Sequence, residues 1–341
     1  MEEQDNNKKR EKNNLYNNFN VNSKSLILKL NFHRNWIRCL TLLKDGRLVA
    51  GSDDYQIIIY NKITYKPDLK LIEESLILYL TTLSSGILAC AITRKIKLLY
   101  IKGNTYQNLQ TFEYHYDWVY KIIELKNNNL VSCSQDRNII FYRKKIELGQ
   151  LNTNQMPINL QILEANTDSH NKYEKDYEIP SDFMHYSMIQ TKENEICYSE
   201  NTKDSYISTI CFYDIYKRKI NSSISGVKTG GPLSPFNLAT KDLLIIGSEN
   251  IISIIDVNEY KIIRLVEMDH SIIFFSFCLL NENMFLIGDN YGAITQWKIE
   301  GDNIILISKK EKVHEKNIYS LIKVGEGHIA SGSYDRLIKI W

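Results

Sequence analysis

The chain has 341 residues, of which 43% are hydrophobic, and its formal net charge at pH 7 is +2. A charge this close to zero provides no global basic field to attract nucleic acid or anionic lipid. The longest uncharged apolar-rich run, residues 271–280, is too short to cross a bilayer, so we expect no membrane span. Residues 1–14 lack the apolar stretch of a secretory signal, so we do not expect secretion.

Residues 1–22 contain eight Asn and few apolar side chains. Such a segment cannot bury enough surface to offset the entropy that is lost when a chain is ordered. We therefore predict a disordered N-terminal tail. Residues 25–32 follow, and their alternation of Leu and Ile with polar residues predicts a β-strand.

A recurring unit begins at His33. It contains three short β-type runs separated by turn residues, a pattern that predicts a three-stranded antiparallel meander. This first unit spans residues 33–60, with Asp54 at its second turn and Tyr60 at its end. Ala50 stands where two later units carry Ser.

The second and third units differ in how well they keep this pattern. The second spans residues 77–100 and has Arg94 where the turn Asp is expected. The third spans residues 115–142 and has the expected residue type at all four positions of the pattern, namely the first His, the Ser before the turn, the turn Asp and the final aromatic residue. These residues are His115, Ser132, Asp136 and Tyr142.

A less regular stretch, residues 143–182, separates the third and fourth units. Residues 160–163 have the composition of a strand, whereas residues 164–177 are polar and show no period. We predict a long surface loop or insertion around residues 164–182. Long loops in compact domains are usually functional or disordered, and we favour disorder.

The fourth, fifth and sixth units match the pattern more weakly. The fourth has a longer turn and no clear His, and the turn of the fifth is one residue short. The sixth keeps its His and Trp, but its Asp is displaced by two residues. The units span residues 188–213, 236–256 and 270–297, and the marked residues of the sixth are His270, Asp289 and Trp297.

The Gly-rich run 226–235 lies between the fourth and fifth units. Gly226 and Gly231 have the glycine spacing of a phosphate-binding P-loop. That motif requires Lys and then Ser or Thr after the second Gly, but Pro232 and Leu233 stand there. We therefore predict a turn that enters the fifth unit.

The seventh unit spans residues 314–341 and matches the third position for position. Its β-type runs are residues 318–322, 328–332 and 337–341. Its marked residues are His314, Ser331, Asp335 and Trp341. A sheet of three short strands is not stable alone, so the units must pack on one another.

The units end at residues 60, 100, 142, 213, 256, 297 and 341, so successive ends lie 40–44 residues apart except across the polar stretch. This period resembles that of WD-repeat (beta-transducin-like) β-propellers, whose blades carry Gly-His near the start and Trp-Asp near the end. The resemblance covers residues 24–341. The chain departs from the family pattern because Gly never precedes the repeat-position His, and only Trp297 and Trp341 occupy the Trp position.

The resemblance implies an all-β fold over residues 23–341, a seven-bladed propeller of four-stranded antiparallel blades. Residues 25–32 have no blade before them, and the seventh unit lacks an outer strand. Pairing of these two segments would close the ring and remove exposed sheet edges.

In this family, Trp, Ser or Thr, His and Asp form a buried, hydrogen-bonded tetrad. The resemblance implies a complete tetrad in the seventh blade and a near match, with Tyr in place of Trp, in the third. The residues are His314, Ser331, Asp335 and Trp341, and His115, Ser132, Asp136 and Tyr142.

The cysteines form no CxxC pair, and all lie in predicted strands, where a buried thiol acts as a small apolar residue. We therefore expect neither a metal nor a cofactor. Unpaired cysteines are typical of a reducing compartment, so we expect the protein in the cytoplasm, with the nucleus as the alternative. The residues are Cys39, Cys90, Cys133, Cys197, Cys211 and Cys278.

No catalytic motif is present, since the chain contains neither HExxH nor GxSxG. Asp53 and Asp54 are adjacent carboxylates, but they occupy a turn, where Asp is favoured because its side chain bonds nearby backbone amides. His33, His115 and His314 hold the tetrad position, as does His270. We predict that the protein is not an enzyme.

What remains is a binding surface. In the family, the face that carries the His and Asp turns usually docks partner peptides. Residues flanking the first strand of a blade, or preceding its turn Asp, tend to face solvent there, and aromatic and Arg side chains dominate binding hot spots. The candidates are Trp36, Arg38, Asp53, Trp118, Tyr120, Gln135, Tyr319 and Tyr334.

These residues predict a scaffold that docks other proteins or peptides and has no small-molecule substrate. The alternative for Trp36 and Trp118 is packing between blades. Two other functions stay open: a propeller enzyme with His or charged residues around the channel, and a nucleic-acid-binding module. The second would need a contiguous basic patch, and the scattered candidates for it are Lys95, Lys97, Arg143, Lys144 and Lys145.

Overall fold

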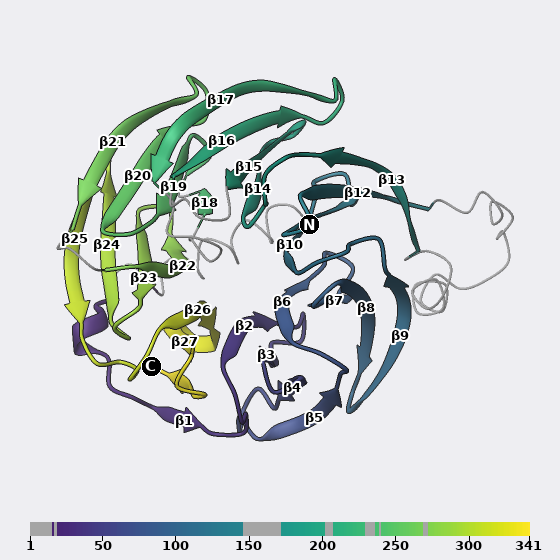
Figure 1. The fold of residues 1–341 in the computed structure, drawn as a ribbon. Helices are drawn as coiled ribbons and strands as arrows, with labels where there is room; N and C mark the ends of the chain where they lie inside the picture. The colour runs from purple at the N-terminus through teal and green to yellow at the C-terminus, as the bar shows by residue number, and fades with distance from the viewer. Residues whose placement is uncertain are drawn as a thin grey trace, which may run out of the picture.

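The runs of β-branched and aromatic residues form strands, because such side chains pack well on a pleated surface. The computed structural model describes residues 16, 19–145, 172–201, 207–228, 236–238, 240–268 and 272–341. These residues form seven four-stranded sheets, arranged radially around one axis (Figure 1). The predicted seven-bladed propeller is therefore confirmed.

In blades 1 to 6 the four strands follow chain order from the axis outward (Figure 1). Blade 1 consists of β2 (Ile37–Leu42), β3 (Leu48–Ser52), β4 (Gln56–Tyr60) and β5 (Pro67–Ile72). Blade 2 consists of β6 (Ile77–Thr82), β7 (Leu88–Ile92), β8 (Lys95–Lys102) and β9 (Thr105–Phe112). Blade 3 consists of β10 (Val119–Glu124), β11 (Leu130–Ser134), β12 (Asn138–Lys144) and β13 (Tyr173–Pro180).

The next three blades repeat this plan. Blade 4 consists of β14 (Met188–Lys192), β15 (Glu195–Asn201), β16 (Ile207–Asp214) and β17 (Lys219–Lys228). Blade 5 consists of β18 (Phe236–Leu238), β19 (Leu243–Gly247), β20 (Ile251–Asp256) and β21 (Lys261–Glu267). Blade 6 consists of β22 (Phe274–Asn281), β23 (Met284–Asp289), β24 (Ile294–Glu300) and β25 (Asn303–Lys310).

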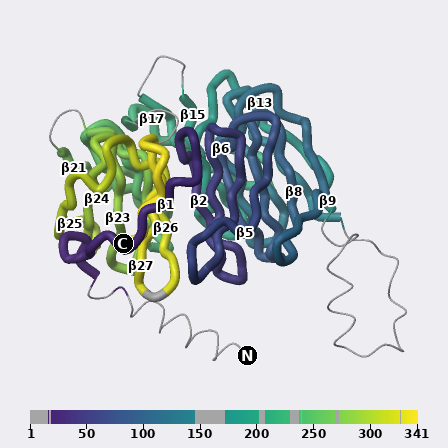
Figure 2. Tube along the Cα trace, turned by 90° about the horizontal axis from the view of Figure 1, so that it is seen from below, coloured from purple at the N-terminus to yellow at the C-terminus, as the bar shows by residue number. Residues whose placement is uncertain are grey.

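Blade 7 is built from both ends of the chain. Its three inner strands are β26 (Ile318–Val324), β27 (His328–Ser333) and β28 (Ile338–Ile340), with the short 3-10 turn η2 (Gly325–Gly327) between the first two. Its outer strand is β1 (Leu28–Leu30), which pairs antiparallel with β28. Figure 2 shows β1 beside this C-terminal blade. The predicted closure of the ring is confirmed.

The core lies between the blades. The second strands β3, β7, β11 and β19 are buried along their whole length, because each is covered on both faces by neighbouring blades. The blades approach very closely at three glycines, one of which is Gly288, where a Cβ would lie 2.8 Å from Ile318 of blade 7. A Cβ on Gly51 would lie 2.5 Å from Ile77 of blade 2, and one on Gly332 would lie 2.8 Å from Ile37 of blade 1. Only glycine fits these positions without displacing a neighbour.

The structure corrects the prediction for residues 1–22. Tyr16, Phe19 and Val21 are buried and join the apolar cluster between blades 6 and 7. Val21 begins the 3-10 turn η1 (Val21–Ser23). The prediction of disorder is therefore wrong for the described residues of this segment, because three widely spaced apolar side chains suffice to anchor it. Residues 1–15 and 17–18 lie outside the described residues.

Two further predictions need correction. The predicted loop at residues 164–182 contains β13, the outer strand of blade 3, in which Tyr173 is buried and pairs with Lys144. Its polar composition suits an outer strand that faces solvent. Likewise, β17 extends to Lys228, so the start of the predicted turn 226–235 is strand. Residues 164–171 and 229–235 lie outside the described residues.

In the described part of the chain, no helix is long and apolar enough to span a bilayer.

Candidate docking surface

The tetrad of blade 7 is complete. His314 bonds Asp335 through Nδ1 at 2.8 Å and Ser331 through Nε2 at 2.7 Å. The Nε1–H of Trp341 donates to the same Ser331 Oγ at 3.1 Å. Because a carboxylate can only accept, the neutral imidazole donates from Nδ1 to Asp335, and its Nε2 accepts from the Ser hydroxyl. Every polar group of this buried chain has a partner.

Blade 3 reproduces this network with a phenol. His115 bonds Asp136 at 2.8 Å and Ser132 at 2.7 Å. The Tyr142 hydroxyl lies 3.0 Å from Ser132 Oγ and takes the role of the indole. Both predicted tetrads are present in the structure.

Blade 1 has the same residues except for the central hydroxyl. His33 bonds Asp54 at 3.0 Å, and Tyr60 ends the third strand. Ala50 occupies the Ser position and supplies no oxygen. As a result, Nε2 of His33 and the hydroxyl of Tyr60 are buried without a partner among the described residues.

The turn Asp of each network connects two segments. In blade 3, one oxygen of Asp136 accepts from Asn138 N–H inside the turn, and the other accepts from His115 and from Tyr116 N–H in the preceding loop. Burial opposes ionisation, but these hydrogen bonds hold the pKa of Asp136 below its usual value. The carboxylates thus fix the loops that present the candidate docking residues.

The irregular blades depart from this arrangement. His185 precedes β14, is fully buried and bonds the carbonyl of Ser199 at 3.1 Å. In blade 6, Trp297 donates to Thr295 at 2.9 Å, and Asp289 accepts from turn amides. His270 lies outside the described residues.

A β-bulge in the innermost strand directs side chains into the channel. In blades 1, 2, 3, 6 and 7 the pairing between the first two strands skips the residue that directly follows the first residue of the innermost strand. Bulges re-aim a side chain in this way. The skipped residues all line a cavity on the axis, and they are Arg38, Leu78, Tyr120, Phe275 and Tyr319.

Five of the eight predicted docking residues form one cluster across blades 7 and 1. Arg38 donates from Nε and Nη2 to the two oxygens of Asp53, each at 2.8 Å. Its guanidinium lies 5.0 Å from the ring of Trp36 and 5.4 Å from that of Tyr319. The Trp36 ring in turn lies 3.8 Å from that of Tyr334. Except for the buried Asp53, these side chains are partly exposed.

The pKa of Arg38 reflects this setting. Burial lowers it, but the hydrogen bonds and charge of Asp53 outweigh that effect, so that it lies above its ordinary value. The guanidinium is therefore charged and held rigidly at the channel mouth.

The other three predicted residues form a second cluster, in blade 3. The Tyr120 hydroxyl donates to Oε1 of Gln135 at 2.8 Å, and its ring lies 6.2 Å from that of Trp118. Tyr120 also meets Tyr186 of blade 4 edge-on at 5.0 Å. The Trp118 ring thus meets a ring of its own blade, whereas the Trp36 ring contacts Tyr334 of blade 7.

The sequence analysis missed Tyr186 and Phe275, which also line the channel cavity. Phe275 directly follows the first residue of β22, as Arg38 follows the first residue of β2. That spacing is visible in the sequence, but the irregular turns of units four and six concealed it.

Four of the five basic residues considered for nucleic-acid binding pair with carboxylates instead. Lys95 pairs with Glu74 and Glu113, and Lys97 pairs with Glu73 at 2.6 Å. Arg143 and Lys145 both pair with Glu174.

No group of His, Cys, Asp or Glu among the described residues is arranged to hold a metal ion.

Comparisons with known proteins agree with this geometry. The family model described as WD domain, G-beta repeat matches residues 24–61 and 308–341. The solved WD40 β-propeller domain of Doa1 matches with a TM-score of 0.69 over 92% of this chain and 95% of that one. The two are 15% identical, so this likeness shows the fold alone. A search of curated proteins found no match.

Proposed function

Because this chain is a WD-repeat β-propeller, we propose that it is a non-catalytic scaffold that docks a partner protein on the face carrying the His–Asp turns. WD40 propellers commonly act as protein-interaction scaffolds. A rigid closed ring is suited to this role, since little conformational entropy is lost when a preformed surface binds.

The cluster of Trp36, Arg38, Tyr319 and Tyr334 carries the proposal. Trp, Tyr and Arg are the residue types that dominate binding hot spots. Here they are fixed against one another before any partner arrives, by the Asp53 hydrogen bonds and the ring contacts. A partly exposed aromatic cluster on a rigid support offers a partner a prepared contact surface.

The enzyme alternative has less support. A catalytic site in the channel would need groups that transfer protons or attack a substrate. Among the described residues, the cavity lining contains hydroxyls, cations and the thiol of Cys39, whose pKa is raised by burial, but neither His nor a carboxylate that could act as their general base. The proposed cellular location is the cytoplasm, because all six cysteines are free and buried.

The test is affinity purification of the tagged protein from its own cells, comparing wild type with the double variant Trp36→Ala and Tyr334→Ala. Loss of two hot-spot rings should weaken binding at least about 30-fold. We expect the specifically bound chains to disappear from the variant sample. These side chains are partly exposed, so the fold should survive, which circular dichroism can check.

A matched control removes two aromatic rings near the opposite face, through Tyr106→Ala and Tyr216→Ala. Both are exposed, at 50% and 69%. This variant should keep every partner. Retention of all partners by the first variant, with the fold intact, would contradict the proposal.

A further inference from the structure

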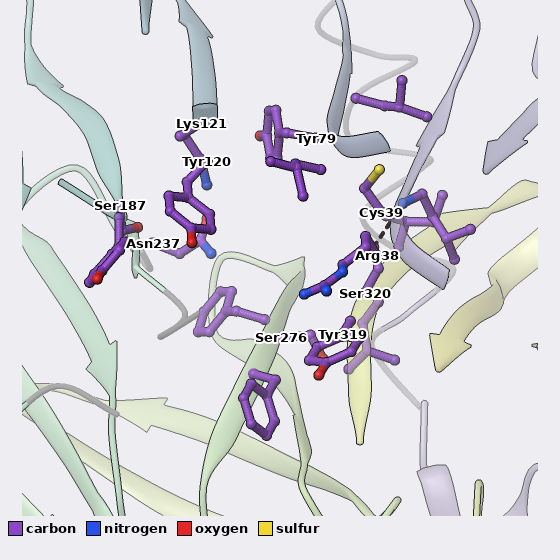
Figure 3. A pocket seen from close by; sticks show the side chains of 18 residues that line it. Arg38, Cys39, Tyr79, Tyr120, Lys121, Ser187, Asn237, Ser276, Tyr319 and Ser320 are labelled. Carbon is purple, nitrogen blue, oxygen red and sulfur yellow. Dashed lines mark hydrogen bonds between the residues drawn. The ribbon is translucent and has the colours of Figure 1, made fainter. Parts of the chain in front are cut away.

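The channel cavity at the centre of the docking face has an unbalanced charge. Among the described residues that line it, the only charged side chains are Arg38 and Lys121, both cationic, and no lining residue is a carboxylate. They come from the innermost strands of blades 1 and 3 (Figure 3). Asp53 contacts Arg38 from outside this lining.

Both cations keep hydrogen-bond donors that bind no acceptor among the described residues. Asp53 takes Nε and Nη2 of Arg38, whereas Nη1 makes no hydrogen bond to a described residue. Lys121 places its ammonium 5.2 Å from the centre of the Tyr79 ring and has no ion pair with a described carboxylate. Asp117 is a second carboxylate outside the lining, and its charge acts on Tyr120 and Tyr186. The positive charge therefore belongs to the lining itself, which holds two cations and no carboxylate.

The dimensions of the cavity limit its occupant. Its volume is about 240 Å³, which is below the range of about 300–1,000 Å³ that is typical of pockets for drug-sized ligands. Tyr79, Tyr120, Phe275 and Tyr319 form much of its wall. The space suits one side chain inserted from a segment that lies across the channel mouth.

We infer that this cavity receives the carboxylate of an Asp or Glu side chain from an extended segment of the partner protein. The inference rests on the proposed docking function and specifies its chemistry. The carboxylate would accept from Nη1 of Arg38 and from Lys121, and charge-assisted hydrogen bonds of this kind are the strong ones. A basic side chain would instead meet two like charges and find no carboxylate in the lining.

A phage-displayed library of random 12-residue peptides, selected on the intact protein, tests this chemistry. Binders that the Trp36→Ala, Tyr334→Ala variant also retains are discarded, because they bind elsewhere. The strongest remaining peptide is then synthesised in two forms that differ only by Glu→Gln or Asp→Asn at the acidic position. Calorimetry gives the Kd of each form.

We expect selected peptides to share one acidic position, and its amide form to bind about 10-fold or more weakly. Lys121→Met should weaken the acidic peptide by a similar factor and leave the amide peptide nearly unchanged. This variant removes no ion partner of a described residue, so it should fold. Lys241→Met, at a side chain 90% exposed on the opposite face, is the matched control and should bind as wild type does.

Enrichment of Lys or Arg, equal Kd values for the two peptide forms, or the absence of any selected peptide would overturn the inference. Binders without acidic preference that still need Trp36 and Tyr334 would leave the docking function standing. Failure of docking itself is detected separately, by the purification experiment.

Discussion

At the scale of single residues, the three His–Asp networks form a natural comparison. His33 and Tyr60 of blade 1 occupy the positions of His115 and Tyr142 of blade 3, but Ala50 replaces the serine that links them. Burying a polar group without a partner costs free energy that a single hydroxyl would recover. Blade 1 therefore has an incomplete network that one substitution can complete.

We predict that Ala50→Ser raises the free energy of unfolding by about 1–2 kcal/mol, because the new hydroxyl would give His33 Nε2 and Tyr60 a shared partner. Ser132→Ala in blade 3 creates the reverse situation and should lower stability by about the same amount. Urea denaturation of both variants measures the two effects. A destabilised Ala50→Ser protein would show that blade 1 has no room for the hydroxyl.

At the scale of elements, a short N-terminal segment locks onto the junction of blades 6 and 7. Gln296 of β24 is fully buried, donates from Nε2 to the carbonyl of Phe19 at 2.6 Å and accepts from Val21 N–H at 2.9 Å. The Tyr16 hydroxyl adds a bond to the carbonyl of Val324. This segment precedes the closing strand β1 and so strengthens the closure of the ring.

Gln296→Leu should lower the free energy of unfolding by about 2–4 kcal/mol, since it leaves a buried carbonyl and a buried N–H without partners. Gln110 offers a matched control, because it bonds both backbone groups of Tyr173 in the same way but is partly exposed. Water can replace it there, so Gln110→Leu should cost about 1 kcal/mol or less. Equal losses in thermal or urea unfolding would refute this account.

At the scale of the whole molecule, buried histidines make stability depend on pH. Burial lowers the pKa of His185 to about 4 and also lowers that of His314, against the opposing effect of Asp335. An unfolded His has a pKa of about 6.5. As the pH falls from 6.5 towards 4, the unfolded chain therefore binds protons that the folded protein does not, and stability decreases.

We predict that His185 alone accounts for a loss of about 2 kcal/mol between pH 7 and pH 4.5. Below about pH 4 a second loss follows, because the turn Asp residues have lowered pKa values and must then be protonated. Urea unfolding at a series of pH values gives the profile. His185→Gln removes one titrating group and should flatten the first decline, and an unchanged slope would contradict the assignment.

Much of the fold was predictable from local pattern. A repeat of 40–44 residues, with Asp and aromatic residues at fixed offsets, identified the blades, because each is a meander whose turns and strands follow from nearby residues. The closing strand was predictable because residues 25–32 lack a preceding blade and the last unit lacks an outer strand. The docking candidates around Arg38 and Tyr120 followed from their place in the repeat.

Other features depend on contacts between residues distant in sequence. Phe19 and Val21 look like part of a polar tail until Gln296, almost 280 positions later, bonds their backbone groups. The polar strand β13 is recognisable only beside β12. The pairing of Arg38 with Asp53 lies within blade 1, but the cavity that Arg38 shares with Lys121 of blade 3 arises only when separate blades converge on one axis. The amino-acid pattern alone therefore determined the blades and their order, whereas only the tertiary structure decided which side chains meet at the centre, because long-range packing brings them together.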